Sequence, residues 1–333
     1  MKPTVVIPLG DVAGIGPEIV IKALNHPEVF EWCRPLVVGE RSCLERAMNS
    51  TGINMKIVEA QEPEKAMYHP GTLMLVDLRN VCADEVPEGK VSAKAGRAAY
   101  EFIEKCTFLL KTGVADVIAT TPINKEALHA AQVPFIGHTE ILAALLGAED
   151  PMTMFQVRSL RVFFLSRHMS LRNACEYINE ERVYSFLKRS HKALAGLMGV
   201  ENPRMAVAGL NPHCGEHGLF GDEEVRCIAP AIEHAQADGL DITGTIGADS
   251  VFHQALEGAY DAVISLYHDQ GHIATKMVDF ERTISLTLGM PYLRTSVDHG
   301  TALNIAGKNL ASEVSMVEAI RLAALYAPKY KAV

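Results

Sequence analysis

Short apolar runs alternate with longer amphipathic segments along most of the chain. The runs Thr4–Leu9, Leu36–Gly39, Met55–Val58, Thr72–Val76 and Val114–Ala119 have the length and composition of buried strands. Residues 93–110 have the helical period and carry small side chains on one face, and residues 312–327 form a second amphipathic helix pattern. This alternation predicts an α/β fold with a largely parallel sheet.

Three further apolar runs each lead to a histidine. They are Val162–Ser166 before His168, Met205–Leu210 before His213, and Tyr260–Leu266 before His268. Open α/β sheets place their chemistry at the carboxyl ends of the strands. Three imidazoles suit a borderline divalent ion and leave coordination positions for a substrate. The pattern therefore predicts a metal site, provided that the three strands share one edge.

A glycine-containing turn follows the first strand. It runs from Gly10 through Asp11, Gly14 and Gly16 to Glu18, and the helical run Ile19–Leu24 comes next, with Pro17 suited to a first helical turn. It is not the dinucleotide fingerprint, because the third glycine is missing and a proline intervenes. From spacing alone, a tight structural turn is the simpler interpretation.

Composition narrows the range of functions. The 333 residues are 48% hydrophobic, and the formal net charge is -9. An acidic chain without a basic stripe argues against nucleic-acid binding, although a local pocket of cations can still bind an anion. Seven cysteines without a CxxC pair indicate reduced thiols in a cytoplasmic protein. No apolar run approaches the length of a membrane span, and no targeting signal precedes the first strand pattern.

Five motifs occur in an order that resembles the 4-hydroxythreonine-4-phosphate dehydrogenase family. They are Gly10–Glu18, Gly137–Glu140, Asn211–Glu216, Tyr267–Gly271 and Thr295–Ala302. The resemblance implies an isocitrate/isopropylmalate dehydrogenase-like fold, with two α/β/α domains, a mostly parallel sheet and a cleft between the domains. The expected division is residues 1–125 plus 295–333, with nucleotide-binding elements, and residues 126–294, with metal and substrate residues.

Within that family, the chain is similar to one branch in Pro122–Leu128, Leu219–Glu224 and the second histidine His272. That branch oxidises 4-phospho-D-threonate or 4-phospho-D-erythronate. The resemblance implies NAD-linked, divalent-metal-dependent oxidation of the C3 hydroxyl of a 4-phosphorylated four-carbon acid, followed by decarboxylation. The alternative substrate is 4-phosphohydroxy-L-threonine, as in pyridoxal phosphate biosynthesis.

The resemblance also implies roles for individual residues. The metal ligands are His168, His213 and His268, and the ion is zinc, magnesium, manganese or cobalt. The substrate-binding residues are His138, Thr139, Lys276, Ser285 and Arg294. The NAD-binding residues are Gly10, Asp11, Gly14, His299, Gly300, Thr301 and Ala302. Ser285 departs from the family, which usually has asparagine in this segment. The family also implies a homodimer with the active site at the subunit interface.

The residue types agree with several of these roles. His138 and Thr139 come just before the helical run Ile141–Leu146, where helix amides and the helix dipole favour an anion, and Thr139 could equally cap the helix. A lysine and an arginine are what phosphate or carboxylate recognition needs. Candidate proton acceptors are Asp249, Asp269 and Lys125, for which a structural ion pair is an equal alternative. His272, four residues after His268, would share its helical face and lie behind the site or toward solvent.

Three alternative functions use part of the same pattern. A metal-dependent aldolase or hydrolase acting on a sugar phosphate would need the three histidines but no nucleotide site. A sugar-acid sensor would need the cations but not the histidines. A dihydrodiol dehydrogenase would need no phosphate-binding residues. The loop His299–Lys308 and the turn Gly10–Glu18 argue against the first, and the three ligand-type histidines at strand ends argue against the second.

Overall fold

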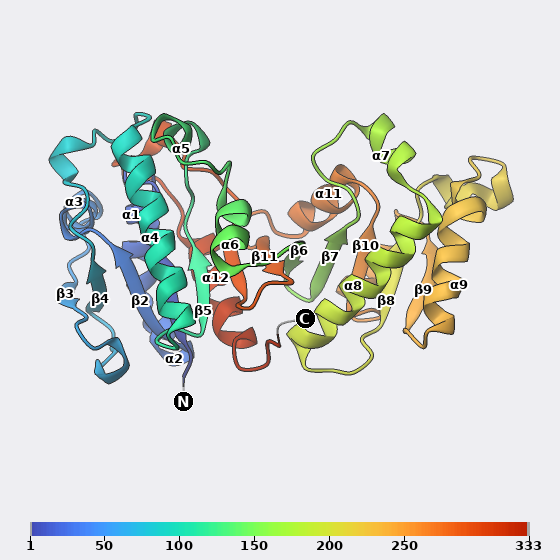
Figure 1. Cartoon of the computed structure of the whole chain (residues 1–333), viewed down its shortest axis with the longest axis horizontal. Coiled ribbons are helices and arrows are strands. Elements are labelled where there is room, and N and C mark those ends of the chain that lie inside the picture. Colours follow the sequence, from blue (N-terminus) through green and yellow to red (C-terminus); the bar gives the residue numbers. More distant parts are fainter. Residues whose placement is uncertain (1, 332–333) are drawn as a thin grey trace. The chain divides into compact units, whose positions relative to one another are not determined.

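The computed structural model describes residues 2–331, which fold into two compact units (Figure 1). Unit 1 contains the chain up to Pro151 together with Met290–Pro328, and unit 2 contains Met152–Gly289 and the residues that follow Pro328. These boundaries differ from the expected ones at 125/126 and 294/295. Residues 126–151 belong to unit 1 because α5 (Lys125–Ala130) and α6 (His138–Leu146) both pack against α4 (Ala93–Lys111).

The strands of unit 1 lie in the order β3-β4-β2-β1-β5-β12, and every neighbouring pair is parallel. Their bounds are β1 (Thr4–Pro8), β2 (Arg34–Gly39), β3 (Lys56–Glu59), β4 (Thr72–Asp77), β5 (Val117–Thr120) and β12 (Arg294–Val297). The remaining helices are α1 (Gly16–Leu24), α2 (Pro27–Trp32), α3 (Arg41–Thr51) and α12 (Val314–Tyr326), with short 3-10 turns η1 (Pro63–Lys65), η2 (Ala83–Glu85) and η5 (Leu303–Ile305). Every residue of β1 is buried, as expected for a strand with helices over both faces.

The predicted long helix is confirmed as α4. Its first turn is capped by Ser92, whose hydroxyl oxygen accepts a hydrogen bond from the Ala95 backbone amide. The small side chains on its buried face allow close approach, and a side chain at Gly96 would collide with the Ala127 carbonyl of α5. The predicted terminal helix is confirmed as α12, which packs on β12 and β5 within unit 1.

The strands of unit 2 lie in the order β11-β6-β7-β10-β8-β9. The pairs from β7 to β9 are parallel, and β6 runs antiparallel to both β7 and β11. The bounds are β6 (Met152–Val157), β7 (Leu160–Phe164), β8 (Met205–Ala208), β9 (Ile242–Ile246), β10 (Ala262–Ser265) and β11 (Ile284–Leu288). The helices are α7 (Leu171–Tyr177), α8 (Glu180–Met198), α9 (Ala229–Ala237), α10 (Val251–Leu256) and α11 (His268–Val278), with η3 (Pro212–Gly218) and a π-helical turn η4 (Glu224–Ile228). The predicted α/β class with mostly parallel strands is confirmed.

The core of unit 2 lies directly beneath the strand ends that carry the histidines. Phe155 of β6 and Phe164 of β7 pack edge to face, with ring centroids 5.2 Å apart, in a cluster that also includes α10 side chains. Helix α11 lies close against these strands because of Gly271, where an added Cβ would be 2.6 Å from the Phe164 ring. No helix within residues 2–331 has both the length and the apolar character that crossing a bilayer requires.

Candidate active site

The three strands that lead to histidines are direct neighbours. Strand β10 pairs in parallel with β7 on one side and with β8 on the other. Their carboxyl ends therefore meet at one edge, which is the condition that the sequence pattern left open. His168 lies in the loop after β7, His213 lies in η3 after β8, and His268 is the first residue of α11 after β10.

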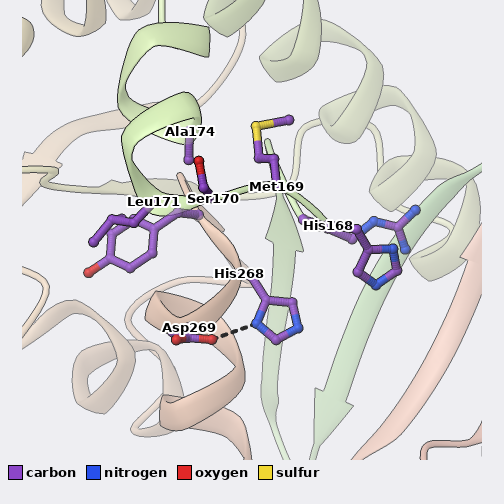
Figure 2. A pocket seen from close by; sticks show the side chains of 9 residues that line it. His168, Met169, Ser170, Leu171, Ala174, His268 and Asp269 are labelled. Carbon is purple, nitrogen blue, oxygen red and sulfur yellow. Dashed lines mark hydrogen bonds and ion pairs between the residues drawn. The ribbon is translucent and has the colours of Figure 1, made fainter.

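Two of the three histidines line one pocket of about 540 Å³ at this edge (Figure 2). The pocket is formed by the loop between β7 and α7 and by the start of α11. Its lining consists of Arg167, His168, Met169, Ser170, Leu171, Ala174, Tyr267, His268 and Asp269. It combines imidazoles, a carboxylate and a guanidinium with an apolar wall from α7, as expected of a site for a small polar ligand.

His268 and Asp269 form a hydrogen bond that prepares the imidazole for a metal. Nδ1 of His268 lies 2.6 Å from Oδ1 of Asp269. Because a carboxylate only accepts, Nδ1 is the donor and Nε2 keeps its lone pair. The ring centroids of His168 and His268 are 6.2 Å apart. Metal–imidazole bonds of about 2.0–2.1 Å place the centres of two rings on one tetrahedral ion roughly 5 Å apart, so the two rings would have to approach each other to share an ion.

His213 stands apart from this pair. Its side chain is 74% exposed, and it is not among the residues that line the pocket. Within residues 2–331, no group of three or more His, Cys, Asp or Glu side chains is gathered closely enough to hold a metal. The structure thus brings two predicted ligands together at a shared edge, and the complete set of three stays a prediction.

His272 supports the site from behind. Its ring stacks on that of His268 with centroids 3.8 Å apart, and it packs edge-on against Phe155 at 4.3 Å. The shared helical face of the two histidines is therefore confirmed, and the orientation is toward the core. Burial is the main cause that lowers the pKa of His272 to about 4, and the neighbouring His268, Lys276 and Arg167 act in the same direction, so its ring is neutral at physiological pH.

A cation that the sequence analysis did not select also lines the pocket. Arg167 precedes His168, and its guanidinium donates to the Thr153 hydroxyl of β6. The only signal for Arg167 in the sequence was its adjacency to a predicted ligand at a strand end. That signal is weak, because an arginine beside a histidine is common. Its position makes it a further candidate for binding an anionic group of a ligand, in addition to the cations that the sequence predicted.

A second group of predicted residues lies in unit 1. Arg294 of β12 is only 6% exposed, and its Nε donates to the Thr120 hydroxyl at the end of β5, 3.0 Å away. Burial lowers the pKa of Arg294 to about 10, against the opposing effect of the Glu140 carboxylate. The guanidinium therefore remains charged at neutral pH, held in a fixed orientation at a strand end.

His138 lies close enough to Arg294 for the arginine charge to act on it. Burial and that charge lower the pKa of His138 well below its usual value, so the ring is neutral. Its Nε2 atom is buried and has no hydrogen-bond partner within the described residues. Helix α6 begins at His138 with Gly137 as the N-cap, and no side chain caps it. Capping by Thr139 is therefore wrong, because Thr139 lies inside the first turn. A fixed cation, a helix N-terminus and an unpartnered ring nitrogen together suit an anion.

The predicted cofactor residues also meet within unit 1. The Ile15 amide donates to the Thr301 carbonyl at 3.0 Å, and a Cβ at Gly14 would be 2.7 Å from that oxygen. Gly14 is therefore needed for packing between the two loops, which supports its structural interpretation. Asp11 is completely buried, and its Oδ2 has no hydrogen-bond partner among residues 2–331. Burial raises its pKa to about 6. A buried acceptor without a donor fits a hydroxyl-bearing ligand such as the ribose of NAD.

The other residues of the NAD prediction, Gly10, His299, Gly300 and Ala302, flank these two loops. Gly10 follows β1, and the other three follow β12. Strands β1, β5 and β12 are parallel neighbours, so these loops come from one edge of unit 1. NAD binding by this edge stays a prediction.

The remaining predicted substrate-binding residues, Lys276 and Ser285, lie in unit 2. Lys276 is half-buried on α11, with its ammonium 5.3 Å from the centre of the Phe280 ring. Ser285 lies directly opposite Phe155 in the antiparallel pair, so it shares the sheet face that contacts His272.

Of the three candidate bases, Asp269 alone lines the pocket. Asp249 is exposed, and its charge acts on Cys214 beside His213. Lys125 is exposed at the start of α5 in unit 1.

The structure thus defines an α/β protein in which neighbouring parallel strands lead to imidazoles in unit 2 and a buried arginine acts on the first residue of α6 in unit 1. The family model described as Pyridoxal phosphate biosynthetic protein PdxA matches residues 31–323, and the chain belongs to this family. The family expected from the five motifs is therefore confirmed.

Individual relatives agree with this assignment. A protein of Clostridium botulinum named "Putative D-threonate 4-phosphate dehydrogenase" is 56% identical over 330 residues, covering 99% of this chain and 98% of the relative. Crystal structures of 4-hydroxythreonine-4-phosphate dehydrogenases from Klebsiella pneumoniae and Burkholderia phymatum are 38% and 42% identical. They superpose with TM-scores of 0.91 and 0.86, and the matches cover 98% and 97% of this chain and 98% of each of those chains.

Proposed function

We propose that the protein is an NAD-linked, divalent-metal-dependent dehydrogenase that oxidises the C3 hydroxyl of 4-phospho-D-threonate or 4-phospho-D-erythronate and then decarboxylates the product. The observation that carries this proposal is the 56% identity, over nearly the whole chain, to a relative named for D-threonate 4-phosphate. The site geometry supports it, since two imidazoles with an orienting carboxylate lie at one strand edge and a buried guanidinium lies at another.

The predicted substrate-binding residues supply charged and polar groups that would recognise a phosphorylated substrate. Arg294, His138 and the amides of the α6 N-terminus offer donors to a phosphate or carboxylate. Thr139 adds a hydroxyl in the first turn of α6, and Lys276 adds a positive charge on α11. Fixing both ends of a four-carbon acid would orient C3, which is the main contribution that binding residues make to such a reaction.

His168, His268 and, as predicted, His213 would hold the metal. When bound, the metal supplies Lewis-acid polarisation of the alcohol and carbonyl oxygens, and NAD supplies the hydride acceptor. Asp11 and the loop His299–Ala302 would hold the nucleotide.

Asp269 has two tasks in this proposal. Its Oδ1 accepts from His268 and keeps that ring in the tautomer that can bind an ion. Its Oδ2 is then the oxygen available to accept the proton of the substrate hydroxyl. Asp249 and Lys125 remain alternative acceptors, and single substitutions at the three positions would rank them through the acid limb of the pH–rate profile.

We further propose that the protein works as a homodimer in the cytoplasm, with the site next to the subunit interface. Ile273 and Met277, four residues apart on α11, are 62% and 80% exposed, and Phe280, just beyond the end of the helix, is 68% exposed. Exposed large apolar side chains that lie near one another commonly mark an interface. Light scattering should report a dimer, and Met277→Glu should yield monomers. A monomeric wild type would contradict this part of the proposal.

The decisive test is NAD reduction by metal-loaded protein with 4-phospho-D-threonate, 4-phospho-D-erythronate and 4-phosphohydroxy-L-threonine in parallel, repeated with His268→Ala and His213→Ala. The proposal expects turnover with a sugar acid and loss of turnover in both variants. Release of CO2 should accompany NADH formation in equal amounts if decarboxylation follows oxidation.

One specific observation favours a second candidate substrate. The two crystal structures are named for 4-hydroxythreonine 4-phosphate and cover nearly the whole chain. Preference for the amino acid would assign the protein to pyridoxal phosphate biosynthesis. Substitution Ser285→Asn, toward the residue usual in the family, should then raise that activity. Turnover without any NADH would instead favour the aldolase class.

A further inference from the structure

The loop that carries His213 has an unusual backbone. Six consecutive residues of η3 have positive φ: His213 at 52°, Cys214 at 56°, Gly215 at 78°, Glu216 at 44°, His217 at 59° and Gly218 at 99°. Left-handed backbone is unfavourable for residues with a Cβ, and a run of it is rarer still. Such a turn persists only where its surroundings hold it, and it is frequent at functional sites. The structure should therefore contain a group that fixes this turn.

That group is the carboxylate of Glu224. Its side chain comes from the π-helical turn η4 and is 3% exposed. Oε1 accepts from the backbone amides of Leu210 and Asn211, at 2.8 and 2.7 Å, and Oε2 accepts from the Asn211 side-chain amide at 2.8 Å. These donors belong to Leu210 and Asn211, the last two of the three residues that join β8 to η3. A buried carboxylate satisfied by three donors is a rigid anchor.

The left-handed turn also packs directly on this anchor. A Cβ at Gly215 would be 3.0 Å from Glu224 Oε2 and 2.6 Å from the Gly221 carbonyl oxygen. The turn is therefore confined between its own base and the segment that leads into η4. The carboxylate of Glu223, the preceding residue, also accepts from the Asn211 side-chain amide, through Oε2 at 2.7 Å.

We infer that Glu224 is a positioning residue for the proposed metal site. Its buried carboxylate holds the base of the left-handed turn at the end of β8, and so keeps His213 at the strand edge that it shares with His168 and His268. This inference rests on the proposed function, because it gives His213 a ligand role. It adds a residue that touches neither metal nor substrate but sets where the third imidazole can reach.

Glu224→Gln is the informative change. Glutamine keeps the size and one acceptor oxygen, but its amide would face the Asn211 side-chain amide, donor against donor. Asp222→Asn is the matched control. Asp222 lies two residues before Glu224, and its exposed side chain pairs with Arg226, so this change also removes one negative charge but leaves the anchor intact. Both variants are compared with wild type and with His213→Ala, using the full-length metal-free protein titrated with Co²⁺.

Two readouts separate positioning from general stability. Hydrogen exchange of the Leu210 and Asn211 amides reports the anchor itself, and the visible absorption of bound Co²⁺ reports the number and type of its ligands. Glu224→Gln should speed exchange at both amides, weaken Co²⁺ binding by about 10–100-fold and shift the Co²⁺ spectrum toward that of His213→Ala. Asp222→Asn should leave all three unchanged.

The outcomes are distinct. If Glu224→Gln speeds exchange but retains wild-type Co²⁺ affinity and spectrum, Glu224 only stabilises the loop and the inference is wrong. If His213→Ala itself leaves the Co²⁺ affinity and spectrum unchanged, the ligand role in the proposed function fails, whatever Glu224 does. Should Glu224→Gln fail to fold, Asn211→Ala removes the side-chain bonds to Glu223 and Glu224, keeps the two backbone bonds to Glu224, and should produce the same changes at smaller size. Wild-type Co²⁺ binding in that variant would also overturn the inference.

Discussion

The two groups of candidate residues differ in how they are exposed to water. In unit 1, Arg294 and Asp11 are buried, and Asp11 Oδ2 and His138 Nε2 are buried without hydrogen-bond partners in the described residues. In unit 2, the side chains of His268 and Asp269 are 39% and 70% exposed and satisfy each other. The first group is rigid and incompletely satisfied, and the second is open and adjustable.

This difference in exposure indicates how each group of residues can contribute to ligand binding and to stability. A buried polar atom without a partner costs folding free energy, about 1–3 kcal/mol, so it persists where a ligand later provides the partner. Exposed imidazoles cost little and can rearrange around an ion. We therefore expect variants in unit 1 to change substrate or nucleotide binding together with stability, and variants at the unit 2 edge to change metal binding with little effect on stability.

The largest effect is expected for Arg294→Met. Loss of a buried, oriented guanidinium should lower kcat/KM with the phosphorylated substrate about 1000-fold, equivalent to about 4 kcal/mol, because it removes the charge that fixes one end of the substrate. Co²⁺ affinity should remain within about twofold of wild type. Steady-state kinetics and a Co²⁺ titration measure the two quantities.

The matched control for this change is Arg282→Met, an exposed arginine paired with Asp279 in unit 2. It should leave kcat/KM nearly unchanged. A decrease of less than tenfold for Arg294→Met would mean that the buried cation serves the fold and not the substrate, and the contrast between the units would lose its functional meaning.

Asp269→Asn tests the open group. An asparagine can offer its amide to His268 Nδ1 and so favour the wrong tautomer, which should weaken metal binding about 10–100-fold. The midpoint of thermal unfolding of the metal-free protein should move little, because Asp269 is mostly exposed. Glu233→Gln, an exposed acid on α9, is the control. Unchanged Co²⁺ affinity in Asp269→Asn would exclude the orienting role.

Sequence patterns predicted the fold well because burial determines which positions of a strand or helix are apolar. Runs such as Thr4–Leu9 and Tyr260–Leu266 are mostly apolar because both of their faces are covered, and the structure places β1 and β10 there. The order of the strands was harder to predict. That β10 lies between β7 and β8 depends on packing among distant segments, and only the structure shows that the three histidines share an edge.

Local backbone geometry explains most of the remaining differences. No spacing rule reveals that His213 and Cys214 adopt left-handed backbone, because residues with a Cβ rarely do so. Thr139 is a good capping residue in general, yet Gly137 occupies the N-cap position and leaves the threonine inside α6. Arg167 was missed because its role depends on a pocket formed by two loops.

The pH dependence of stability should differ between the units, and Asp11 provides the test in unit 1. Its folded pKa, about 6, lies above the ordinary value of 3.8. Wild-type protein should therefore lose stability relative to Asp11→Asn as pH rises from about 4 to 6, by up to about 3 kcal/mol, and the two should be nearly equal below pH 4. Denaturant unfolding of both proteins across this range measures the difference. A pH-independent difference would contradict the burial of an unpartnered carboxylate.

His272 provides the smallest and opposite effect, in unit 2. Its folded pKa, about 4, lies below the ordinary value of 6.5, because the ring is packed against Phe155 and Phe164 and beside positive charges. The stability that depends on its neutral form is fully present above pH 6.5 and is lost as pH falls toward 4, because the unfolded chain then binds the proton more readily. His272→Gln should lose less stability on acidification than wild type, whereas His253→Gln, at an exposed position of α10, should follow wild type. If wild type and His272→Gln lose stability in parallel on acidification, this ring is more hydrated than its contacts indicate. The conclusion that a buried His272 ring packs behind His268 would then be wrong.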